Sequence, residues 1–156
     1  SLVYGIKTGY KTSRIEASMN YSRITSEGRY LMPREWGRDP LFTFLPRERN
    51  EGFGDVHAIL GKFNYSFKPG LFSAGLGVGY YNLPDVKNTT LNKYGMPSYV
   101  QANLDVRYFF KGFFEGFDVQ YLLAAKFNAG EIYDNDKYVF NKVDMQVHNL
   151  VLNFHF

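Results

Sequence analysis

The chain has 156 residues, a formal net charge of +3 and no cysteine, so it contains neither disulfides nor thiolate metal sites. Its basic and acidic side chains are mixed along the sequence instead of forming a basic stripe, and we therefore expect no binding of nucleic acid. No apolar run approaches the roughly 18 residues of a membrane-spanning helix, which excludes a helical membrane protein.

Two alternating segments open the chain, at residues 2–11 and 14–23. In the first segment, Tyr4 and Ile6 alternate with small and basic residues such as Lys7. The second segment repeats the pattern after a short turn. Alternation with a period of two residues predicts β-strands that have one apolar and one polar face.

A long and highly charged connection follows, at residues 25–55. It includes the stretch PREWGRDPLFTFLPRERNEGFGD, with three of the six prolines and the only tryptophan. The stretch is too irregular for a helix and too charged for a buried strand, and its prolines oppose regular strand pairing. Its apolar piece Leu41–Leu45 is too short to span a membrane. We predict a stiff loop with the candidate functional residues Arg34, Glu35, Arg38, Asp39, Arg47 and Arg49.

Five more alternating segments follow, at residues 57–67, 71–81, 99–110, 117–128 and 145–156. The pattern is clearest in 99–110, where Val100 and Leu104 oppose Gln101 and Asp105. The polar rows contain basic side chains that are candidates for contact with a solute. These candidates are Lys62, Arg107 and Lys126.

The lengths of the segments favour a membrane protein. Each has about ten residues, the length of a strand tilted across a bilayer, whereas strands of globular proteins have about five or six. Short turns alternate with long polar connections, and aromatic residues gather near the turns, as in outer-membrane barrels. We therefore predict an all-β protein, a transmembrane antiparallel up-and-down β-barrel with apolar rows towards lipid and polar rows towards a water-filled lumen.

Seven strands do not complete such a barrel. Single-chain bacterial barrels have an even number of strands, and an open strand edge cannot face lipid without a large cost in hydrogen bonding. The chain starts at Ser1. We therefore interpret residues 1–156 as the C-terminal portion of one larger barrel domain, whose remaining N-terminal strands are absent from this chain.

Other interpretations remain open at this stage. A non-transporting structural or adhesive barrel with a filled lumen has the same pattern, and so does a soluble ligand-binding barrel with its apolar rows inside. Asp55 and His57 share one face of a strand but have no hydroxyl or second carboxylate to complete a hydrolase site. We expect no enzymatic activity, no cofactor and no metal, since the loop residues Glu131, Asp134 and Asp136 lack the spacing of a calcium loop.

The charged stretch at 33–55 resembles the corresponding segment of the OprD-family outer-membrane porins, chiefly in its core REWGRDP…PRERNEG. The final strands, which end in LVLNFHF, are similar to the C-terminal part of that family. The resemblance implies an 18-stranded monomeric pore for passive, substrate-selective diffusion of small carboxylate-bearing solutes. It also implies that residues 1–156 hold the twelfth to eighteenth strands and that 25–55 is an extracellular loop that narrows the pore.

These expectations define the location and the partners. The location is the outer membrane of a Gram-negative bacterium, and the expected partners are outer-membrane lipids and lipopolysaccharide, small solutes in the pore, and the missing strands of the same barrel. The terminal aromatic residues Phe154 and Phe156 look like the signal by which barrel-assembly machinery recognises its substrates.

Overall fold

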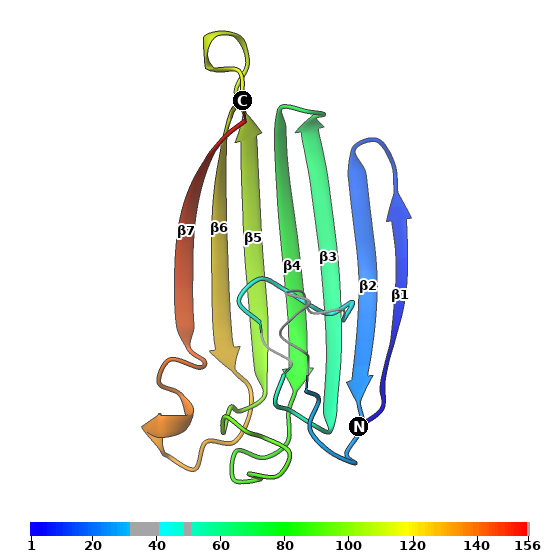
Figure 1. Cartoon of the computed structure of the whole chain (residues 1–156), viewed down its shortest axis with the longest axis vertical. Helices are drawn as coiled ribbons and strands as arrows, with labels where there is room; N and C mark the ends of the chain where they lie inside the picture. The colour runs from blue at the N-terminus through cyan, green and yellow to red at the C-terminus, as the bar shows by residue number, and fades with distance from the viewer. Residues whose placement is uncertain (32–40, 49–50, 156) are drawn as a thin grey trace.

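A computed structural model of the chain describes residues 1–31, 41–48 and 51–155. These residues form one antiparallel sheet in which each strand pairs with its neighbour in the sequence (Figure 1). The strands are β1 (Val3–Lys11), β2 (Ile15–Ile24), β3 (Val56–Lys68), β4 (Phe72–Asn82), β5 (Tyr99–Phe109), β6 (Phe117–Asn128) and β7 (Met145–Phe154). The predicted all-β class, the positions of the strands and their antiparallel order are confirmed.

The connections are short at one end of the sheet and long at the other (Figure 1). At the short end, Gly70 (φ 73°) turns the chain between β3 and β4, and Gly116 (φ 95°) leads into β6. Both positions need the left-handed backbone region that glycine enters at little cost. We call this end the turn end and the opposite one the loop end.

The strand register separates the side chains into two faces. On one face, Ile6, Ile59 and Phe127 belong to a row of directly paired residues and are 69%, 49% and 49% exposed. The next row lies on the other face, where Leu60 and Gln101 are fully buried. Residues 41–48 cover the middle of this second face, which we call the loop face (Figure 1). We call the uncovered, apolar one the bare face.

The buried core lies at the loop end of the sheet and not between two sheets. It includes Phe53, Tyr81, Tyr99, Met96 and Val143, which join strand ends to the long connections. Leu76 and Leu104 lie outside this core, on the bare face. Within residues 1–31, 41–48 and 51–155, the bare face has no covering layer, and no strand pairs with the outer edge of β1 or β7.

Helix is almost absent from the part of the chain that the structure describes. It is limited to two single turns of 3-10 helix, at Gly112–Phe114 and Asp136–Tyr138. Neither is long or apolar enough to cross a membrane. The apolar piece at 41–45 forms turns and adds no strand to the sheet, in line with its short length.

Candidate functional site

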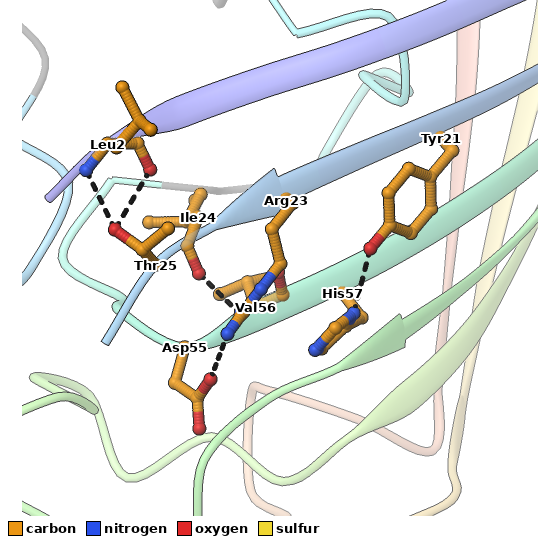
Figure 2. A network of polar contacts seen from close by, with 8 residues as sticks. All are labelled: Leu2, Tyr21, Arg23, Ile24, Thr25, Asp55, Val56 and His57. Carbon is orange, nitrogen blue, oxygen red and sulfur yellow. Dashed lines mark hydrogen bonds and ion pairs between the residues drawn. The ribbon is translucent and has the colours of Figure 1, made fainter.

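The long connection between β2 and β3 is held together at its base (Figure 2). Arg23, near the end of β2, donates from Nη2 to Asp55 Oδ1 at 2.6 Å and from Nη1 to the carbonyl oxygens of Ile24 and Val56. The same guanidinium therefore binds the last residue of β2, the last residue of the connection and the first residue of β3. Thr25 is bound in turn to the backbone of Leu2, the residue just before β1.

From this base the connection returns over the loop face, where residues 41–48 lie across β3, β4 and β5. Side chains of these three strands donate hydrogen bonds to backbone carbonyl oxygens of the returning segment. The bonds are Tyr81 to Thr43 (2.7 Å), Lys62 to Phe44 (2.9 Å), Gln101 to Pro46 (2.8 Å) and Asn103 to Pro46 (3.0 Å).

A row of glycines lies under the returning segment. Gly75, Gly77 and Gly79 alternate along β4 and all face it. A Cβ atom at Gly77 would lie 2.7 Å from Cδ2 of Leu45, which is far closer than such atoms approach each other. The absence of side chains on this strip therefore gives Leu45 the room that it occupies. Glycine inside a strand often marks a close approach of another part of the chain, so the alternating glycines are the signal in the sequence that could have indicated this contact.

The three basic residues predicted to face the lumen all lie on the loop face, each with its own surroundings. Lys62 donates to the returning segment. Arg107 forms an ion pair with Asp118 at 2.9 Å. Lys126 is largely buried, with its ammonium 5.0 Å from the centre of the Tyr99 ring. Their predicted contact with a solute stays a prediction.

Asp118 is the centre of a polar cluster at the turn end of the loop face. Its side chain is fully buried and accepts hydrogen bonds from Arg107, from Asn153 Nδ2 (2.9 Å) and from His155 Nε2 (2.8 Å). The donors come from β5, from β7 and from the residue after β7. Because three donors satisfy one buried carboxylate, the cluster ties the end of the chain to the neighbouring strands.

Of the residues predicted to form the pore loop, Arg47 is described. Its backbone is in the left-handed region (φ 72°), and its Nη2 donates to Asn149 Oδ1 at 2.8 Å on the loop face of β7. The predicted residues outside the described part of the chain are Arg34, Glu35, Arg38, Asp39, Arg49 and Phe156. Phe154 lies on the bare face, where its ring centroid is 4.5 Å from that of Phe117.

A cavity of about 570 Å³ opens between the returning segment, the loops at the loop end and the loop face of β6 and β7. Its charged lining residues are Arg47, Glu48, Lys126 and Lys142. Lys142 donates to the carbonyl oxygens of Lys137 (2.7 Å) and Gly95 (3.3 Å), and burial followed by the charge of Lys137 lowers its pKa. Three cations and one carboxylate make this lining favourable for an anion.

The geometry does not assemble a catalytic or metal centre from the residues considered for one. Asp55 binds Arg23, whereas His57 binds the hydroxyl of Tyr21 at 2.9 Å (Figure 2), so the two do not form an acid–base pair. Among the described residues, no group of three or more histidine, aspartate or glutamate side chains is arranged to hold a metal ion.

Comparison of the chain with protein-family models, with curated proteins and with solved structures finds no match.

Proposed function

We propose that the chain is the C-terminal part of a β-barrel of the bacterial outer membrane and that this barrel is a channel for small solutes. The observation that carries the proposal is the opposite character of the two faces. The bare face exposes large apolar side chains such as Ile6, Leu76 and Leu152 along whole strands. The loop face buries polar and charged ones such as Asn20 and Asp118. In water this arrangement is unfavourable, whereas lipid outside and water inside satisfy both faces.

A continuous band of aromatic rings at the turn end supports the membrane environment. Each ring centroid of the band lies between 4.5 and 6.5 Å from the next. Its members are Tyr65, Phe67, Phe72, Tyr108, Phe110, Phe114, Phe117 and Phe154. Aromatic bands of this kind occur where a barrel meets the headgroup region, in contact with membrane lipids.

The direction of the edge strands supports the presence of further strands. β1 and β7 run in the same direction, because six antiparallel steps separate them (Figure 1). They cannot pair with each other in an antiparallel way. An odd number of additional strands restores antiparallel pairing all round and makes the total even, as in single-chain outer-membrane barrels.

The loop face supports selectivity in such a channel. The returning segment narrows the space over the loop face. Arg107, in its ion pair, and the cations that line the cavity of about 570 Å³ place charge along this space. A net positive lining lowers the energy of small anions, including carboxylates, in a site with low-dielectric walls. Passive diffusion of small carboxylate-bearing solutes is therefore the proposed activity.

A barrel with a filled lumen and a structural or adhesive role is the second candidate. It is favoured by the number of bonds that hold residues 41–48 on the wall, since a segment attached to three strands is also suited to closing a lumen.

Planar lipid bilayers distinguish the two functions. The full-length protein that contains this chain is reconstituted, and the current is recorded in potassium chloride. A channel gives discrete conductance steps, an anion-selective reversal potential in a salt gradient, and a lower current when a small carboxylate is added. A protein that is folded and inserted but conducts no ions would overturn the channel and favour the filled barrel.

A further inference from the structure

The strip Gly75, Gly77 and Gly79 is costly for a β-strand, because glycine loses more conformational freedom on folding than other residues and has no side chain to pack. All three glycines lie on one face, in the middle of β4. Their neighbours across the sheet are polar except for Leu60, which pairs with Gly79, and Gly77 lies between Lys62 and Asn103. The strip is thus a groove without side chains of its own, between two rows of mostly polar side chains.

Leu45 is the side chain that fills this groove. It is 4% exposed, and its Cδ2 occupies the space that a Cβ of Gly77 would need. Gly79 leaves similar room for Tyr81, whose ring would lie 2.8 Å from a Cβ at that position and whose hydroxyl binds the carbonyl oxygen of Thr43. The hydrophobic contact of Leu45 therefore depends on Gly77, and the hydrogen bond of Tyr81 depends on the neighbouring Gly79.

The polar neighbours complete the attachment. Lys62 on one side and Gln101 and Asn103 on the other donate to carbonyl oxygens of the segment. These bonds depend on the backbone path of the segment, whereas the apolar contact depends on the identity of residue 45. The depth at which Leu45 lies in the strip therefore determines the distance between the segment and the loop face of the sheet.

We propose that Gly77 and Leu45 form a seat that positions residues 41–48 on the wall and thereby sets the width and the selectivity of the channel. This inference deepens the proposed function and rests on it. Gly77 and Leu45 act here as positioning residues, because they change the open space through the segment and need not contact the solute themselves.

The test combines substitutions at both members of the pair. Gly77→Ala introduces the Cβ that collides with Leu45 and should lift the segment, since overpacking strains a close contact. The double variant Gly77→Ala with Leu45→Ala removes the colliding methyl groups and should restore the docked position. Gly61→Ala is the matched control, because Gly61 lies on the bare face of β3, where a new Cβ would meet Met19 Sδ at an ordinary 3.4 Å.

Docking is measured apart from channel activity. The chain has no cysteine, so Thr43→Cys introduces a single thiol at a fully buried position whose bond to Tyr81 uses the backbone carbonyl. We expect Gly77→Ala to raise the rate at which a water-soluble maleimide labels this thiol about tenfold, because a strained contact opens more often. The double variant and Gly61→Ala should label at the parent rate.

Conductance is then recorded for the same variants of the full-length protein in planar bilayers. Gly77→Ala should conduct more current and discriminate less between anions and cations, and the double variant should return both values towards the parent. Unchanged labelling and unchanged conductance in Gly77→Ala would overturn the seat while leaving a conducting channel intact. Faster labelling in a protein that conducts in no variant would support the seat and overturn the proposed function.

Discussion

Ion pairs between single residues on the loop face differ in how much each can contribute to the free energy of unfolding. The Arg107–Asp118 pair includes a fully buried carboxylate, whereas Lys11 and Glu16 form a pair at 3.2 Å with side chains 75% and 46% exposed. Removing a donor from a buried carboxylate costs the desolvation of that group, but an exposed pair is largely screened by water. We expect Arg107→Gln to lower the free energy of unfolding by about 1–3 kcal/mol, measured by denaturant titration of the folded protein in lipid vesicles.

Lys11→Gln provides the comparison for this prediction. It removes a cation from the same face and should change the free energy of unfolding by no more than about 0.5 kcal/mol. Equal losses in the two variants would show that the cluster around Asp118 contributes no more than a surface pair.

At the scale of the strand, β6 offers adjacent leucines on opposite faces. Leu122 pairs with Asp105 and Asn149 on the loop face, and Leu123 pairs with Leu104 and His148 on the bare face. If the bare face meets lipid, Leu123→Arg near the middle of the strand costs about 2–4 kcal/mol. Leu122→Arg should cost much less, because its charge faces water. The measurement is the denaturant midpoint in lipid vesicles together with the yield of inserted protein.

The outcome of this pair of variants identifies the environment of each face. A greater loss from Leu122→Arg than from Leu123→Arg would place hydrocarbon on the loop face and contradict the proposed orientation. Because the two positions share residue type, strand and depth, differences in local strand propensity do not explain a large gap between them.

At the scale of the whole molecule, the unpaired outer edges of β1 and β7 allow a test of whether further strands close the barrel. β1 contains no proline, and a free edge of this length would be an aggregation hazard. If further strands close the barrel, the amide groups of β1 that point away from β2 are bonded in the intact protein. Hydrogen exchange should then find these amides as protected as those of the central strand β4. Rapid exchange along β1, like that of an exposed loop such as 87–90, would contradict closure by additional strands.

The strands could be predicted from the sequence because alternation is a local property. The segment 99–110 predicts β5 (Tyr99–Phe109) within a residue, since each pair of neighbouring side chains already shows which face is apolar. The placement of Lys62, Arg107 and Lys126 on one face follows from the same counting. None of this requires knowledge of distant parts of the chain.

The partners of these residues are a property of the tertiary structure. Leu45 meets Gly77, and Lys62 meets the carbonyl oxygen of Phe44, although the end of the connection and part or all of β3 separate the partners in the sequence. Side chains so far apart are brought together only when the connection returns over the sheet, and its path depends on all the bonds that hold it. Periodicity assigns a residue to a face, because it reports the local backbone; only the folded chain determines what that face contacts.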